Sequence, residues 1–280
     1  MTSFVRDPRL TRIRPATRWP RLDIAELWHY HELLGIFVWR DLAVRYKQTS
    51  IGVAWAIFQP VLVAIVYPVI FGRFAHFDSG GVYYGVFVFA GLLPWQYFSS
   101  GLSSGAGCLV ANVNLVTKVY FPRLLLPLSA ILTPVVDLAI GCLVLLGMMA
   151  WRNEWPGGPQ ILLAPAFLLL AAVTVLGLAL GLSAVNVRYR DVPYAIPVFL
   201  QVLPFLSGVP VQIDSLPERW QWILSLNPMT AVIAGWRWAV LDTPAPDLGQ
   251  TAVGVGVAIV LLFVGLAYFR SSEPGFADTI

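Results

Sequence analysis

Few side chains in this sequence could do chemistry, and those that could do not form a catalytic pattern. The three histidines are His29, His31 and His76, and no cysteines or carboxylates accompany them at the spacing of a metal site. A glycine-rich phosphate loop is also missing, because the only lysines are Lys47 and Lys118 and neither follows a glycine. The sequence therefore predicts no catalytic residues, no metal and no cofactor in this chain.

One acidic residue, Asp137, lies in the middle of a long apolar stretch. A carboxylate at such a depth in a membrane is costly, and it often marks a proton pathway. It can also be a hydrogen-bonding anchor between helices. We favour the anchor, because a proton-coupled carrier usually needs more than one such group.

The apolar stretches also contain many aromatic rings, which could bind a ligand. Most membrane aromatics face lipid or the protein core, but sugar rings also stack on aromatic faces through their C–H edges. The rings that we select as a candidate glycan path are Trp55, Phe58, Tyr67, Trp95, Phe199 and Phe205.

These residues must be positioned by long apolar segments, each of which reaches or approaches the ~20 residues that a helix needs to cross a membrane. The segments are residues 51–71, 83–110, 124–151, 161–185, 192–211 and 251–269. Hydrophobic residues make up 58% of the chain and charged residues only 12%, which a soluble domain of 280 residues could not bury in one core. We expect an all-α integral membrane protein with six transmembrane helices.

The charge distribution predicts the orientation. With both termini in the cytoplasm, fourteen of the 18 lysines and arginines fall on the cytoplasmic side, as the positive-inside rule requires. The net charge of +3 is too small to indicate a nucleic-acid-binding protein. No cleavable signal peptide is visible in the first fifty residues.

Residues 1–49 are expected to form a cytoplasmic tail followed by an amphipathic interface helix. Asp23 and Glu26 resemble a capping box, and apolar residues follow at helical spacing along one face, including Trp28. Trp28 and Trp39 suit the headgroup region of the membrane, where half-polar rings are favoured. One interpretation of this helix is that it is merely a membrane anchor. Residues 50–280 would form the six-helix transmembrane domain.

Two short cytoplasmic connectors concentrate charge. Residues 111–122 are long enough for two or three helical turns before Pro122 ends the helix. Lys118 in this helix either contacts a soluble partner or is simply a positive-inside determinant. Residues 186–192 form a tight turn, and both interpretations apply to its charges as well.

The outer connector, about residues 213–242, is too apolar for a loop and too broken for a transmembrane helix. Asn227 and Pro228 divide it into pieces of about 10 Å and 20 Å, shorter than the ~30 Å hydrocarbon core. Two short re-entrant or interfacial helices fit best. They either line an outer exit or form an interfacial hairpin without a role in transport.

Small residues four apart predict close contacts between helices. The pairs are Gly81 with Gly85, Gly101 with Gly105, and Gly177 with Gly181. They are packing signals only.

Three motifs in order resemble one family. They are RDLAVRYKQTSIGVAW at residues 40–55, running into Pro60, then NVRYRDV at residues 186–192 and LNPM at residues 226–229. Together with the order of segments, they resemble the membrane subunit of ABC-2 type polysaccharide exporters, the permeases for O-antigen or teichoic-acid polymers.

This resemblance implies a homodimer of permeases with two ATP-binding cassette subunits, which would bind ATP and Mg²⁺. The cargo would be a polyprenyl-diphosphate-linked polysaccharide, and the location the bacterial cytoplasmic (inner) membrane, in contact with membrane lipids. The missing phosphate loop is then expected.

The resemblance also implies roles for individual residues. The ATPase-coupling residues would be Glu26, Arg40, Asp41, Arg45, Asn114, Lys118, Tyr120 and Arg123. The cytoplasmic mouth would hold Arg188, Arg190 and Asp191. The outer gate would hold Trp220, Asn227, Pro228 and Met229.

Three alternatives remain open at this point. The first is an exporter of the same superfamily that moves a small drug or ion. The second is a membrane-embedded enzyme, which would need a cluster of acids or histidines at one membrane face. The third is a proton-driven carrier that uses Asp137.

Overall fold

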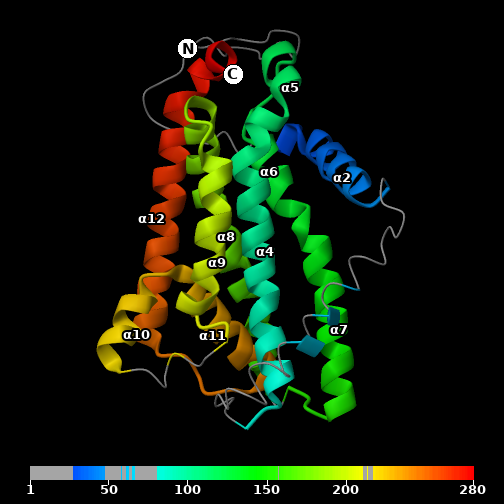
Figure 1. Ribbon diagram of the computed structural model, residues 1–280, viewed down its shortest axis with the longest axis vertical. Helices are drawn as coiled ribbons and strands as arrows, with labels where there is room; N and C mark the ends of the chain where they lie inside the picture. Colours follow the sequence, from blue (N-terminus) through cyan, green and yellow to red (C-terminus); the bar gives the residue numbers. More distant parts are fainter. Residues whose placement is uncertain are drawn as a thin grey trace, which may run out of the picture.

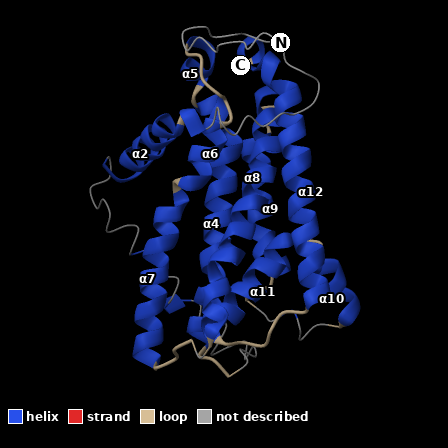
Figure 2. Cartoon of the chain, turned by 180° about the vertical axis from the view of Figure 1, so that it is seen from behind, coloured by secondary structure: helices blue, strands red, loops and turns tan. Residues whose placement is uncertain are grey.

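The computed structural model describes residues 28–47, 58, 61–62, 65–66, 81–156, 158–210, 213 and 217–280. In these ranges the chain is helical with connecting turns and contains no strand (Figure 2). The predicted first span, residues 51–71, lies almost entirely outside the described residues. The same holds for the predicted coupling residue Glu26 and the path residues Trp55 and Tyr67.

The helices form an elongated bundle (Figure 1). In chain order they are α2 (His31–Lys47), α4 (Tyr84–Ala111), α5 (Val113–Lys118), α6 (Leu125–Leu132), α7 (Pro134–Arg152), η2 (Pro159–Leu163), α8 (Ala164–Arg188), α9 (Val192–Leu206), α10 (Glu218–Ser225), α11 (Pro228–Leu241), α12 (Leu248–Ser272), η4 (Glu273–Gly275) and α13 (Phe276–Thr279). Figure 1 shows α5 and the C-terminus at one end of the bundle, which we call the α5 end. The opposite end, where α10 and α11 lie, is called the α10 end.

Three helical stretches in the described part are long and apolar enough to cross a membrane. They are Leu125–Arg152, Pro159–Arg188 and Leu248–Gly275, with mean hydropathies of 2.2, 2.6 and 2.5. Their lengths correspond to about 42–45 Å of helix, more than the ~30 Å hydrocarbon core. Helix α9 is apolar but shorter.

Helix α9 ends earlier than the predicted span of residues 192–211. Its last residue is Leu206, and the chain turns at Gly208, which has a φ of 76°. This left-handed conformation favours glycine and stops a right-handed helix. Residues 207–210 are therefore a non-helical connector at the α10 end.

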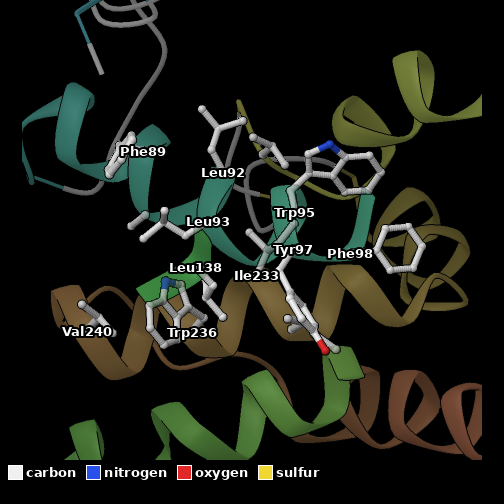
Figure 3. Close-up of a cluster of buried hydrophobic side chains, with 14 of the residues drawn as sticks. Phe89, Leu92, Leu93, Trp95, Tyr97, Phe98, Leu138, Ile233, Trp236 and Val240 are labelled. Carbon is white, nitrogen blue, oxygen red and sulfur yellow. The ribbon is translucent and has the colours of Figure 1, made fainter. Parts of the chain in front are cut away.

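Helix α4 is the centre of the bundle and packs against α6, α7, α8, α9 and α11. Residues Val86, Phe87 and Val88 have no exposed surface, which is the pattern of a helix that is covered on all sides. Figure 3 shows part of the core that it forms with Leu138 of α7 and Trp236 of α11.

The prediction of close helix contacts at small residues is confirmed at two crossings. A Cβ added at Gly105 of α4 would lie 2.6 Å from the Cβ of Ala179 of α8. A Cβ added at Gly177 of α8 would lie 2.6 Å from the backbone of Leu261 of α12, opposite Gly265. Larger side chains do not fit there, so α8 is held close to both neighbours.

Helices α10 and α11 are separated at Asn227 and Pro228, where the sequence predicts the break. Asn227 caps α11, because its Oδ1 accepts a hydrogen bond of 3.1 Å from the backbone N–H of Met229. Its Nδ2 donates to Ser207 Oγ at 2.8 Å, which ties α11 to the connector after α9.

The same connector is held by a buried arginine of α11. Arg237 is 4% exposed and donates to the carbonyl oxygens of Phe87 at 3.0 Å, Gly208 at 2.7 Å and Val209. Its guanidinium occupies the space that a Cβ at position 91 would need, so Gly91 leaves room for the arginine. Carbonyls outside a helix need donors when water is excluded, and Arg237 supplies them from one planar group.

We predict that Arg237→Lys destabilises the protein, because the compact ammonium group lacks the planar fork of donors that reaches carbonyls of both α4 and the connector. The expected loss is about 2–4 kcal/mol of unfolding free energy, seen as a lower midpoint of thermal unfolding in detergent. The matched control is Arg219→Lys on the exposed surface of α10, which should leave the midpoint unchanged. Equal midpoints for Arg237→Lys and the wild type would contradict the role assigned to Arg237.

Candidate functional site

The predicted coupling residues near α5 lie on the outside of the α5 end. Val116 is 3% exposed and anchors the helix in the core. Asn114, Lys118 and Tyr120 are exposed, and the Tyr120 side chain is 76% exposed. These three side chains are accessible to a partner protein.

Helix α5 is shorter than the predicted helix over residues 111–122. It ends at Lys118, and Val119 is already extended. Phe121 then enters the core, 6% exposed, with its ring 5.6 Å from that of Phe37 of α2. Because Phe121 also precedes Pro122, an extended backbone is favoured there.

A C-terminal cluster ties the chain after α5 to the end of α12. Arg123 donates to the carbonyl oxygen of Glu273, whose carboxylate pairs with Arg270 at 2.8 Å. Phe276 is 1% exposed and packs edge-on against Phe269, with ring centroids 5.2 Å apart. Arg123 is thus engaged within the chain, unlike the exposed Lys118.

The predicted mouth residues lie at the same end. Arg188, Arg190 and Asp191 are exposed in the turn between α8 and α9. Arg190 Nη2 is 3.5 Å from the carbonyl oxygen of Ile280. The structure therefore brings the mouth turn, α5 and the C-terminal segment to one end of the bundle.

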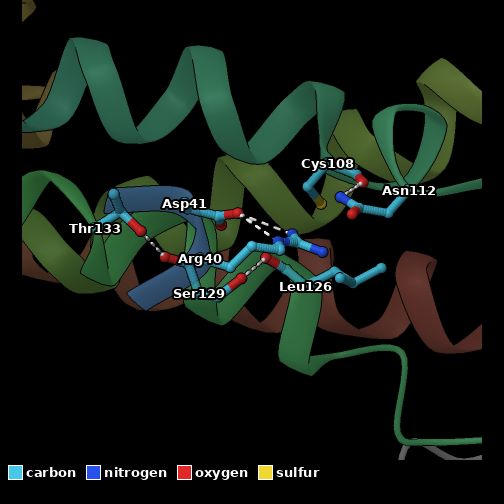
Figure 4. A network of polar contacts seen from close by, with 7 residues as sticks. All are labelled: Arg40, Asp41, Cys108, Asn112, Leu126, Ser129 and Thr133. Atoms are coloured by element: carbon cyan, nitrogen blue, oxygen red, sulfur yellow. Dashed lines mark hydrogen bonds and ion pairs between the residues drawn. The ribbon is translucent and has the colours of Figure 1, made fainter. Parts of the chain in front are cut away.

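Helix α2 lies beside α6, as Figure 4 shows for Arg40 and Asp41 next to Ser129. Arg40 pairs with Asp41 at 2.8 Å. The inward residue is Phe37, 5% exposed, whereas Trp28 and Trp39 point outward with 75% and 74% of their surface exposed.

The predicted single apolar face of this segment is therefore wrong in part. The sequence predicts Trp28 on the apolar face, yet Trp28 is exposed, whereas Leu34 and Phe37 pack against the core. Apolar residues lie on both sides of α2, with Ile36 62% exposed on the outer side. Outward aromatic side chains are favourable at a membrane surface. The spacing of apolar residues alone therefore could not identify which face of α2 packs against the bundle.

Asp137 joins α2 to α7. Its carboxylate pairs with Arg45 and accepts a hydrogen bond from the Tyr46 hydroxyl. Burial and the hydrogen bond to Asp137 raise the pKa of Tyr46 to about 12, so the phenol keeps its proton and donates. This geometry supports the interpretation of Asp137 as an anchor between helices.

A groove of about 360 Å³ lies between α4, α9 and the connector that follows α9. Its lining residues are Leu92, Trp95, Gln96, Leu200, Gln201, Pro204, Phe205, Val209 and Pro210. Trp95 and Phe205, two of the predicted path aromatics, meet here. Phe199 and Phe58 are 66% and 48% exposed and lie outside the lining of this groove.

The predicted outer-gate residues lie at the α10 end. Trp220 of α10 is 46% exposed and carries the Arg219 guanidinium 5.2 Å from its ring. Met229 is 1% exposed, and Pro228 beside it is also buried. The break between α10 and α11 is therefore packed against the bundle, while α10 remains on the surface.

Comparison with known families decides the class of the protein. The sequence profile described as ABC-2 type transporter matches residues 32–241, which include every described helix from α4 to α11. The chain belongs to this family.

Relatives of this ABC-2 family member match along most of their own length. The O-antigen export system permease protein RfbA of Myxococcus xanthus is 27% identical over 92% of this chain and 98% of its own. RfbA of Klebsiella pneumoniae is 24% identical over 91% and 97%. The polysialic acid transport protein KpsM of Escherichia coli is 25% identical over 84% and 91%.

Family membership explains the lack of a catalytic constellation. An ABC-2 protein is a transporter component and not an enzyme, and its class implies a partner ATPase that uses ATP and Mg²⁺. The described residues contain no group of three or more histidine, cysteine, aspartate or glutamate side chains able to hold a metal. The chain is a multi-pass membrane protein of this family.

Several polar residues at these sites were not selected from the sequence. Gln96 and Gln201 line the groove, Tyr46 completes the contact to Asp137, and Asn186 is 2% exposed and donates to the carbonyl of Ala106 at 3.1 Å. For Gln96, Gln201 and Asn186, the available signal was an amide side chain within an otherwise apolar stretch. Like the Asp137 carboxylate, such an amide is costly in apolar surroundings unless it has a hydrogen-bond partner, but it carries no charge.

We predict that Asp137→Ala loosens α2 without disturbing α7. Amide hydrogen exchange in residues 31–47 should become about three- to tenfold faster, because a half-exposed ion pair and one hydrogen bond are lost. Arg45→Ala should act in the same direction, and the double variant should be little worse than either single one. Asp191→Ala, at an exposed carboxylate, is the control. Unchanged exchange in α2 would refute the anchor.

Proposed function

We propose that this chain is the membrane-spanning permease of an ABC transporter that exports a lipid-linked polysaccharide, such as an O-antigen, across the bacterial cytoplasmic membrane. The observation that carries the proposal is the near full-length similarity to permeases named for O-antigen export and polysialic acid transport. A shared cargo class is favoured when the match covers the whole transmembrane domain and not one segment.

Six membrane crossings are part of the proposal. They would be α4, α6 with α7, α8, α9, α12 and the predicted first span at residues 51–71. The α5 end would face the cytoplasm with both termini. Support for this orientation comes from the basic residues at that end, Lys118, Arg123, Arg188, Arg190 and Arg270, in line with the positive-inside rule.

The permease would act as a homodimer with two ATP-binding cassette subunits. Helix α9 exposes an apolar stripe. A second permease could cover this stripe, as lipid could, and in this sense the stripe supports the dimer. The stripe comprises Tyr194, Val198, Phe199, Val202 and Phe205, each at least 56% exposed. The cargo, linked to a polyprenyl diphosphate, would pass between the two copies.

ATP-driven closure of the partner subunits would push on α5 through Asn114, Lys118 and Tyr120. The outer gate would be α10 and α11, two re-entrant helices at the exit. Their support is the buried Arg237, since a broken backbone at membrane depth survives only where the protein supplies its hydrogen bonds.

The alternatives are less well supported. A proton-driven carrier would need a free carboxylate, whereas Asp137 is engaged by Arg45 and Tyr46. An exporter of a small drug or ion stays possible on fold alone, but the named relatives favour a glycan.

The experiment that tests the function is depletion of this protein in its native cell. We expect finished lipid-linked polysaccharide to accumulate in the cytoplasmic leaflet while surface glycan falls. Unchanged surface glycan would overturn the proposal and favour export of a small molecule.

We predict that Lys118→Glu uncouples transport from hydrolysis, because the charge of an exposed contact to the ATPase is reversed. Surface polysaccharide should fall at least about tenfold, since a like-charge contact at an interface costs roughly several kcal/mol and about 1.4 kcal/mol is already tenfold. The permease should still insert, and the partner should still hydrolyse ATP. Arg219→Glu, a charge reversal at the α10 end, is the control and should export normally. Wild-type export by Lys118→Glu would exclude α5 as the coupling element.

A further inference from the structure

The groove between α4 and α9 contains two amide side chains that no packing role explains. Gln96 lies about midway along α4, and Gln201 lies in the second half of α9. Neither amide has a hydrogen-bond partner within the described ranges. At such a depth a polar group facing lipid is unfavourable, so an amide kept there indicates a polar occupant.

Two backbone carbonyls of the groove are already engaged. The carbonyl oxygen of Pro210 accepts from the Tyr84 hydroxyl at 2.9 Å, and that of Val209 accepts from Arg237. Pro204 and Pro210 have no N–H to donate. The side-chain hydrogen bonds that an occupant could make therefore come from Gln96, Gln201 and the indole N–H of Trp95.

The chemistry of the lining selects the kind of occupant. No acidic, basic or histidine side chain lines the groove, which makes it a poor site for a diphosphate. An amide offers both donors and an acceptor, as a hydroxyl group requires. Trp95 and Phe205 add aromatic surface. Figure 3 shows Trp95 on the side of α4 turned away from Trp236, and its largely buried indole, part of the core cluster, also lines the groove.

We propose that this groove is a subsite for one uncharged sugar residue of the exported glycan, whose hydroxyls hydrogen-bond to Gln96 and Gln201 while its apolar face packs on Trp95 and Phe205. The inference rests on the proposed function. A volume of about 360 Å³ agrees with one ring and its water, being at the small end of ligand sites. Its place beside the connector held by Arg237 puts it next to the α10 end.

The test replaces each amide by an apolar side chain of similar length, Gln96→Met and Gln201→Met, singly and together, in a native cell that lacks its own copy. The double variant should export on the order of tenfold less surface polysaccharide per inserted permease, from two hydrogen bonds to the cargo. ATP hydrolysis by the permease with its ATPase should be unchanged. Gln250→Met is the matched control, because Gln250 bonds Gln221 outside the groove, and it should export normally.

A second measurement avoids any effect on folding. Gln201→Cys in a Cys142→Ala background would be assembled first and then modified with a bulky neutral maleimide. Export should fall on modification, and the Cys142→Ala background treated alone should not respond. Wild-type export by the double Met variant, or by the modified cysteine variant, overturns the subsite. Failure of the wild type itself to export polysaccharide overturns the proposed function instead, so the two outcomes are distinct.

Discussion

The hydrogen-bonding needs of the backbone in apolar surroundings determine how this chain is built. A membrane interior supplies no donors or acceptors, so every carbonyl outside a helix needs a partner from the protein itself. The connector after α9 meets this need through Arg237, which reaches Gly208 and Val209, and through Tyr84, which reaches Pro210. Without these donors the chain could not leave the helical conformation at residues 207–210, and α11 could not dock where it does.

The same constraint connects the two ends of the molecule. The first third of helix α4 is covered on all sides, and α8 is in backbone contact with α12 at Gly177 and Gly265. Tightly packed helices of this kind move as rigid bodies and not by local bending. A displacement at the α5 end, where the C-terminal cluster fastens Arg123 to Glu273, would therefore be carried along α12 and α8 towards the α10 end.

Patterns of hydropathy and turn residues were sufficient to predict most helices, because a membrane segment is set by length and apolarity alone. The break at Asn227 and Pro228 could be predicted, since both residues act locally. The inner face of α2 and the partners of Asp137 could not. Arg45 and Asp137 are 92 residues apart in the chain, and only tertiary packing brings them together. The groove escaped prediction for the same reason: Trp95 and Phe205 were selected as rings, but the two glutamines between them only become neighbours when α9 packs on α4.

Charge is distributed unevenly along the bundle, with exposed cations at the α5 end and an uncharged groove nearer the α10 end. Lys118, Arg188 and Arg190 are exposed at the α5 end, where an anionic lipid headgroup or diphosphate could be attracted. The groove nearer the α10 end is uncharged, and the one deeply buried cation described there, Arg237, is bonded to backbone carbonyls. A charged site along the proposed path would retain an anionic linker, whereas the neutral amides and aromatic faces of the proposed subsite would bind each sugar weakly and release it. Weak, repeated contacts are what a long polymer needs in order to keep moving.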